Sequence, residues 1–248
     1  MRYRARSVAG LVIVLLLVSG TALAGMNYKS VVTNTGPLAY YRVDESSGTT
    51  AKTVAGGFSG TYIGSPALSQ TGLVHDGDMA VKFDGVNDAI NANSVANHTG
   101  WPGMTMEAWV EVTRSAPSNE EHIMNFSTSS GGHAPGLFHD SPTNKIKFAV
   151  GSSTSFAISN NGISSGTHLF VGTVGTDNVS RLYVDGVLQN QKGKITVRPQ
   201  PGWLFIIGAD HDFGPVTTSF WKGRIDEPAV YTYALSSSQV AAQWAAGK

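Results

Sequence analysis

Acidic residues in one late loop are the first groups in this 248-residue chain that could do chemistry. Asp210-His211-Asp212 places two carboxylates two residues apart, directly after an apolar run, and Phe213 follows them. Such carboxylates suit a metal ion or the hydroxyl groups of a sugar. The alternative is a solvated loop at the rim of the fold, where polar residues need no ligand.

Aromatic and histidine side chains near loops form a second group of candidates. Sugars present apolar C–H faces beside dense hydroxyl groups, so an aromatic ring next to Asn, Asp or His suits them. Trp101, His139 and Trp203 lie in or near segments rich in Gly, Ser, Asn and Pro. We therefore predict a ligand-binding surface that includes these three residues and the loop 210–213. Each aromatic residue taken alone also fits ordinary core or edge packing.

Glu107 is the carboxylate best placed to act as a general acid or base from a strand. Glycosidic cleavage requires two carboxylates that face each other across a defined gap. Glu111 follows on the same side of the strand, with no Asp between the two. The sequence leaves a Ser–His–Asp triad open. We predict no catalytic residue and interpret Glu107 as a structural carboxylate.

Alternation of apolar and polar residues predicts that β-strands position these groups. Met104–Val112 is the clearest case, because every second residue from Met104 is apolar. Strand signals recur about every eight to twelve residues, which predicts an all-β fold of two antiparallel sheets packed as a sandwich. The other predicted strands are Tyr28–Thr35, Leu38–Val43, Gly60–Ile63, Ala80–Gly85, Asp88–Asn91, Ile123–Phe126, Leu137–Phe138, Lys145–Val150, Thr154–Ile158, His168–Val174, Ser180–Leu188 and Leu204–Gly208.

The chain closes with a strand from Phe220 and a short helix. Pro228 has no N–H to donate, so it implies an edge position or a bulge. Gly223 leaves room for a neighbouring backbone. Ser236 and Gln239 have the spacing of a capping box, and Gly247 is expected to end the helix.

Three phrases of the sequence resemble the laminin-G-like (concanavalin A-like) jelly-roll domains. They are Tyr40-Tyr-Arg-Val-Asp-Glu-Ser-Ser-Gly48, the strand Met104–Val112, and Gly223-Arg-Ile-Asp-Glu followed by Ala234-Leu-Ser236. Pro228 and Ala229 depart from the family phrase. The resemblance covers roughly residues 38–243. It implies a jelly roll that recognises carbohydrate or another surface ligand through its rim loops, as lectins do.

The resemblance also implies a structural calcium ion, held by residues near the two ends of the domain. The positions that match are Asp44 and Asp226. A second Asp-containing turn, common in the family, is replaced here by Thr53–Gly57 without a carboxylate. The alternative is that Asp44 starts a turn and Asp226 pairs with Arg42 or Arg224.

Residues 1–24 have the pattern of a signal peptide. Three arginines precede the apolar run 9–18, and Ala22-Leu23-Ala24 is a cleavage site. Residues 25–248 are then one exported domain, secreted or otherwise outside the cytoplasm and not inserted in the membrane after cleavage. The chain has no cysteine, so disulfides do not hold it together. No basic run follows the signal, which argues against nucleic acid as a partner.

The function predicted from the sequence is recognition without catalysis, with a carbohydrate or a cell-surface glycan or protein as partner. Two alternatives stay open. One is a hydrolase or lyase of the same fold that uses Glu107, and the other is a structural or adhesive surface component.

Overall fold

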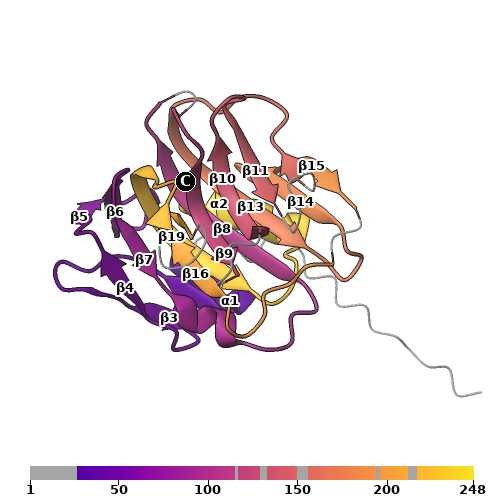
Figure 1. The fold of residues 1–248 in the computed structure, drawn as a ribbon, viewed down its shortest axis with the longest axis horizontal. Helices are drawn as coiled ribbons and strands as arrows, with labels where there is room; N and C mark the ends of the chain where they lie inside the picture. Colours follow the sequence, from indigo (N-terminus) through magenta and orange to yellow (C-terminus); the bar gives the residue numbers. More distant parts are fainter. Residues whose placement is uncertain (1–26, 115–116, 129–132, 150–155, 194–195, 212–216) are drawn as a thin grey trace, which may run out of the picture.

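Two antiparallel β-sheets that face each other form the body of the molecule (Figure 1). The computed structural model describes residues 27–114, 117–128, 133–149, 156–193, 196–211 and 217–248. The predicted all-β sandwich with a short C-terminal helix is confirmed. The predicted signal peptide lies outside the described residues.

Sheet A has nine strands and sheet B has eight among the described residues. Sheet A runs in the order β15 (Val187–Lys192), β14 (Ser180–Val184), β13 (Gly166–Val174), β8 (Met104–Val112), β19 (Lys222–Tyr231), β1 (Ala39–Tyr41) and β3 (Thr53–Ala55), with β6 (Met79–Asp84) beside β19 and β5 (Ala67–Thr71) beside β6. Sheet B runs in the order β12 (Phe156–Ile158), β11 (Lys145–Ala149), β10 (His133–Asp140), β9 (Glu121–Ser127), β16 (Leu204–Ile207), β7 (Ala89–Asn91), β4 (Gly60–Ile63) and β2 (Thr50–Ala51). A small ladder joins β17 (Asp210–His211) to β18 (Thr217–Thr218), and a 3-10 helix, η1, covers Asn93–Asn97.

Strand β8 shows why the two layers form. Its apolar residues Met104, Met106, Ala108, Val110 and Val112 all lie in the core between the sheets. Side chains alternate between the faces of a strand, so Trp109 and Glu107 point to the outer face of sheet A. That face is covered by the two helices α1 (Tyr28–Thr35) and α2 (Ser237–Gly247), which lie side by side.

Helix α1 corrects the prediction of a strand over Tyr28–Thr35. Asn27 caps the first turn by accepting a hydrogen bond from the backbone N–H of Ser30 at 3.0 Å. Gly36 ends the helix in the left-handed conformation. The buried residues Tyr28, Val31 and Val32 have helical spacing, and their contact with the outer face of sheet A decides the conformation.

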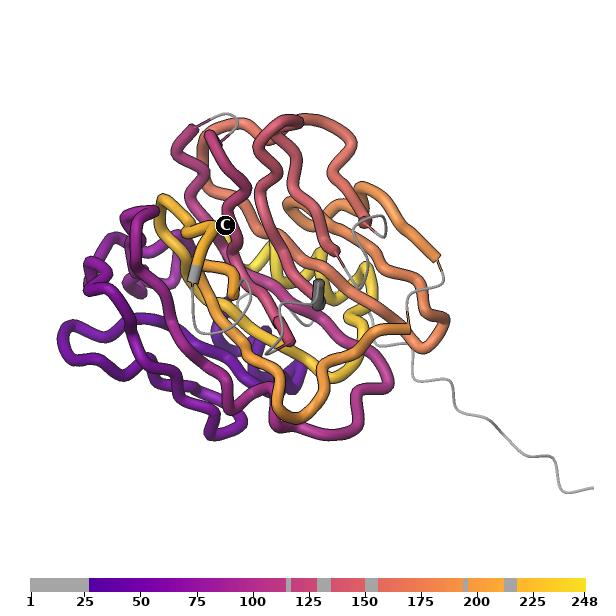
Figure 2. Tube along the Cα trace, viewed as in Figure 1, coloured from indigo at the N-terminus to yellow at the C-terminus, as the bar shows by residue number. Residues whose placement is uncertain are grey.

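Strand β19 lies in the middle of sheet A, between earlier segments of the chain (Figure 2). Its register to β8 shifts between Asp226 and Ala229, so Pro228 lies in a bulge and not at an edge. Before the bulge β19 pairs with β6, and after it with β1. Glu227 has a positive φ of 56° within the bulge. The bulge therefore changes the neighbour of β19 and re-aims two acidic side chains.

The C-terminal helix forms as its sequence predicts. Ser236 and Gln239 make the reciprocal hydrogen bonds of a capping box, and the helix ends at Gly247. Trp244 stacks on Trp109 with ring centroids 5.0 Å apart. A Cβ atom on Gly247 would lie 2.3 Å from the Trp109 ring, so only glycine allows this close approach.

Candidate functional site

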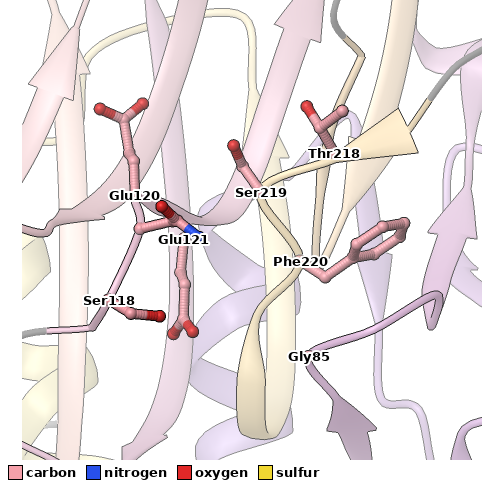
Figure 3. A pocket seen from close by; sticks show the side chains of 8 residues that line it. Gly85, Ser118, Glu120, Glu121, Thr218, Ser219 and Phe220 are labelled. Carbon is pink, nitrogen blue, oxygen red and sulfur yellow. The ribbon is translucent and has the colours of Figure 1, made fainter.

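A polar pocket of about 430 Å³ opens at the rim, where the segment before β9 meets the segment before β19. Figure 3 shows its lining side chains on these two segments, with Glu120 and Glu121 pointing in opposite directions. Its lining residues are Gly85, Ser118, Asn119, Glu120, Glu121, Thr218, Ser219 and Phe220. The lining thus combines carboxylates, an amide and hydroxyls with a single aromatic ring, that of Phe220.

His122 holds the two sides of the pocket together. Its backbone N–H donates to the carbonyl oxygen of Ser219 at 2.9 Å, next to an isolated parallel bridge with Phe220. Its side chain is 5 % exposed and stacks on Phe138 with ring centroids 4.9 Å apart. Its Nε2 lies 2.7 Å from Glu120 Oε1. No pattern in the sequence indicated the pairing of His122 with Ser219 and Phe220, because about a hundred residues separate the two segments.

Two further contacts fix the wall that carries Ser118 and Glu121. The hydroxyl of Ser141 donates to the carbonyl oxygen of Pro117 at 2.7 Å and approaches that of Ser118 at 3.1 Å. Glu121 forms an ion pair with Arg114 across the segment that joins β8 to β9. Because Arg114 pairs with its charge, Glu121 stabilises the wall of the pocket. Glu120 is the more exposed of the two carboxylates.

Asp210 and His211, the described part of the predicted loop 210–213, lie beside this pocket in strand β17. Asp210 pairs with Thr218 in the ladder of β17 and β18, and its Oδ2 lies 3.8 Å from His122 Nε2. Its other carboxylate oxygen accepts a hydrogen bond from Asn125. His211 is buried and pairs with Thr217 in the same ladder. Asp212 and Phe213 lie outside the described residues.

The other predicted ligand-binding residues are packed against the core. Trp101 is 9 % exposed, stands edge-on to Phe126, and donates its indole N–H to the carbonyl oxygen of His98 at 2.9 Å. His139 is 1 % exposed with Nε2 2.8 Å from Asn144 Oδ1, and burial lowers its pKa. Trp203 is half-buried against the core. Their roles in binding stay predictions, and little of their surface faces solvent.

Glu107 is enclosed beneath helix α2, as expected for a structural carboxylate. It has no exposed surface, and its Oε1 accepts hydrogen bonds from the Tyr231 hydroxyl at 2.7 Å and the Gln243 amide at 3.0 Å. Burial raises its pKa to about 8 against the effect of these two donors. A substrate cannot reach this carboxylate while the helix is in place.

A serine, a histidine and an aspartate meet at the start of β13. Ser164 Oγ lies 3.5 Å from His168 Nε2, and His168 Nδ1 lies 2.8 Å from Asp185 Oδ2. The segment 162–166 has the G-x-S-x-G spacing of some serine hydrolases, but it leads into a strand and not into a helix. The carbonyl oxygen of Ser164 lies closer to Nε2, at 3.1 Å. A carbonyl only accepts, so Nε2 donates there and is not free to take the hydroxyl proton.

A second acidic site lies where the ends of the described chain meet sheet A. It gathers Asp44 and Asp226, the two residues predicted for a metal, with three residues that the sequence did not single out for it. Asp76, Asp78 and Glu227 place ligand oxygens within 4.8 Å of one another. Two aspartates on either side of Gly77 were the signal of this group in the sequence, and the same spacing is also typical of an ordinary turn.

The pKa values of this carboxylate cluster are displaced by burial. Burial raises the pKa of Asp226 to about 7, although its Oδ2 accepts the backbone N–H of Leu73 at 2.7 Å. Burial and the charge of Asp226 raise the pKa of Glu227 to about 10. Burial lowers the pKa of Arg42, but the carboxylates of Glu227, Asp78 and Asp76 outweigh it, and the net shift is upward. Arg42 is thus a permanent cation close to three carboxyls whose pKa values burial raises, those of Asp78, Asp226 and Glu227.

Arg42 occupies the place that a calcium ion would need. Calcium takes six to eight oxygen ligands at about 2.3–2.6 Å, and oxygens within 4.8 Å of one another can share one ion. The Nη atoms of Arg42 lie between 2.5 and 3.3 Å from one carboxylate oxygen each of Asp76, Asp78 and Glu227. The cluster does not fit calcium alongside Arg42 in this arrangement, and the calcium ion stays a prediction.

The fold and the rim pocket together define a class of protein: β-sandwich domains with a jelly-roll arrangement and loops that gather at a rim. Residues 84–241, well over half of the chain, match the family model described as the concanavalin A-like lectin/glucanases superfamily. The chain belongs to this family.

Solved structures with the same fold come from a sialidase and a toxin. A Trypanosoma rangeli sialidase in complex with 2,3-difluoro-KDN is 18 % identical in sequence, with a TM-score of 0.63. The match covers 85 % of this chain and 32 % of the sialidase chain. The receptor binding domain of botulinum neurotoxin C/D mosaic serotype is 13 % identical, with a TM-score of 0.62. The match covers 86 % of this chain and 51 % of the toxin chain. The chain thus spans about a third of the first and half of the second, and the likeness concerns the fold. A comparison with curated proteins gave no match.

Proposed function

We propose that this domain recognises carbohydrate without cleaving it, through the rim pocket beside β9. The observation that carries the proposal is the pocket itself, with a volume of about 430 Å³ and a lining of hydroxyls, an amide and carboxylates around Phe220. A volume of this size holds one or two sugar rings. Membership of a family that includes lectins supports the same conclusion.

The chemistry of the lining suits a sugar. Phe220 is half-buried and leaves part of its ring for the apolar C–H face of a pyranose. The side chains of Asn119, Thr218 and Ser219 can donate to and accept from hydroxyl groups. Glu120 supplies a charged acceptor, and its contact with His122 keeps it in place.

Three observations support recognition without catalysis. Glu120 and Glu121 are consecutive and point to opposite sides, so they do not face each other across a sugar (Figure 3). Glu121 is already paired with Arg114. Glu107, which the alternative function as a hydrolase or lyase would use, is buried beneath helix α2.

The setting that we propose is outside the cytoplasm, after removal of residues 1–24. The pattern of the first 24 residues supports it. Within the described ranges, no helix is long and apolar enough to cross a membrane.

Glycan binding by residues 25–248 tests the proposal. A glycan array identifies the ligand, and calorimetry then compares Phe220→Ala and Glu120→Gln with the unaltered domain. We expect Phe220→Ala to weaken binding roughly tenfold, because a lost aromatic contact is worth about 1.4 kcal/mol. Glu120→Gln should weaken it several-fold. Leu188→Ala, an exposed residue on β15, is the matched control and should leave the affinity unchanged.

Other outcomes would decide between the alternatives. Glycan binding that none of the pocket variants weakens would place the site elsewhere on the domain. Release of sugar products from a polysaccharide panel would make the protein an enzyme. No glycan bound, together with self-association in gel filtration, would favour a structural or adhesive component.

A further inference from the structure

Among the described residues, Arg42 is the single cation that contacts all three carboxylates of the acidic triad Asp76, Asp78 and Glu227. Its Nη1 lies 3.1 Å from Asp76 Oδ2 and 3.3 Å from Glu227 Oε1, and its Nη2 lies 2.5 Å from Asp78 Oδ2. The Arg42 side chain is 13 % exposed, and those of its partners are 5 % exposed or less. The guanidinium is therefore largely shielded from water.

In each of these carboxylates, the two oxygens have different partners. One oxygen accepts from the protein: Asp76 Oδ1 from the N–H of Asp78, Asp78 Oδ1 from the N–H of Met79, and Glu227 Oε2 from the hydroxyl of Tyr40. The other oxygen faces Arg42. The carboxylates are thus oriented toward one central cation by contacts that do not involve Arg42.

Asp226 adds an independent sign that this place is built for positive charge. It has no exposed surface, and its Oδ1 has no hydrogen-bond partner in the part of the chain that the structure describes. Leaving a buried carboxylate oxygen unpaired is costly unless a nearby cation offsets it. The bulge of β19 places Asp226 and Glu227 next to each other at this position.

We propose that Arg42 is the resident cation of this cluster, and that a divalent cation of the calcium type binds these carboxylates only in its place. The Nη atoms and such an ion need the same volume, because both lie within about 3 Å of the same three oxygens. Removing the guanidinium while keeping the carboxylates should therefore create a site for a divalent cation.

Terbium luminescence tests this directly, because Tyr40 touches Glu227 and can transfer excitation energy to an ion bound there. Residues 25–248 should show no saturable terbium signal on tyrosine excitation, whereas Arg42→Gln should show a saturable signal that calcium displaces. Arg181→Gln, which breaks the exposed pair with Asp177, is the matched control and should behave like the unaltered protein.

Thermal unfolding gives a second readout. The unaltered protein should have the same Tm, within about 1 °C, in EDTA and in millimolar calcium. Arg42→Gln should lose about 6 °C or more in EDTA, because it leaves buried carboxylates unpaired, and should regain much of this loss in calcium.

Two results would overturn the proposal. A Tm of the unaltered protein that falls in EDTA, with saturable terbium binding, would mean that Arg42 and the metal coexist. An Arg42→Gln protein that folds and neither binds terbium nor responds to calcium would mean that the cluster holds no metal. If Arg42→Gln does not fold, Arg42→Lys keeps the charge but not the fork that reaches several carboxylates, and terbium binding by this variant decides the question.

Discussion

Glu107 projects from strand β8 toward helix α2 and has no exposed surface. One carboxylate oxygen accepts from Tyr231 and Gln243, and the other has no hydrogen-bond partner within the described ranges. Its pKa of about 8 means that the buried carboxyl holds a proton at neutral pH. A single side chain thereby makes the attachment of α2 sensitive to pH.

The stability of the fold should therefore fall as the pH rises from about 4.5 to about 8. The folded state keeps the Glu107 proton more tightly than the unfolded chain, so each pH unit in this window costs up to about 1.4 kcal/mol. Glu107→Gln mimics the protonated form and should reduce this slope, leaving the part that comes from Asp226 and Glu227, whose pKa values burial also raises. Urea denaturation at pH 5, 6, 7 and 8 measures both slopes.

Glu111→Gln is the control for this prediction. The hydrogen bonds from Arg224 hold the pKa of Glu111 below its ordinary value, so its titration lies at more acidic pH. This variant should keep the slope of the unaltered protein between pH 5 and 8. Equal slopes in Glu107→Gln and the unaltered protein would show that Glu107 is not the titrating group.

At the scale of elements, the bulge of β19 and the cap of α2 decide where the functional groups lie. The bulge changes the partner of β19 from β6 to β1 and directs two acidic side chains toward Arg42. The cap starts α2 at Ser237, so that Val240 and Trp244 fall on the face that covers sheet A.

The cap of α2 can be tested without touching the core. Ser236→Ala removes the side chain that accepts from the N–H of Gln239 and should lower the free energy of unfolding by about 1 kcal/mol. Ser237→Ala, one residue on and exposed, should change it by less than about 0.5 kcal/mol. Chemical denaturation of both variants measures the difference, and equal losses would contradict a specific role for the cap.

At the scale of the whole molecule, Trp109 connects the two ends of the described chain. The ring of Tyr28 from α1 stands edge-on to it at 5.9 Å, and Trp244 from α2 stacks on it at 5.0 Å. On the inner side of the same sheet, one core cluster joins both layers. Long-range pairing of this kind favours unfolding as one unit.

We accordingly expect residues 25–248 to unfold in a single transition. The calorimetric enthalpy should equal the van't Hoff enthalpy, and far-UV circular dichroism and tryptophan fluorescence should give the same Tm. Two resolved transitions would instead divide the chain into separate folding units.

The sequence by itself determined the local structure of much of this protein. Alternation placed β8 with the correct face inward, and the spacing of Ser236 and Gln239 started α2 where the structure has it. These features depend on residues that are neighbours along the chain. The prediction of a strand over Tyr28–Thr35 was wrong, because the conformation of this segment depends on its contact with sheet A, which no local pattern contains.

Only the tertiary structure decided the two candidate sites. Phe220 reaches Glu120 through a bridge to His122, and Asp76 reaches Glu227 because β6 and β19 pair in sheet A. The sequence offered Asp226 for the second site through its family phrase and named Arg42 or Arg224 as its alternative partner, but it did not indicate that Asp76, Asp78 and Glu227 would contact Arg42. The physical reason is that strand pairing and a bulge set which distant side chains meet, whereas composition and spacing set only which chemistry each can bring.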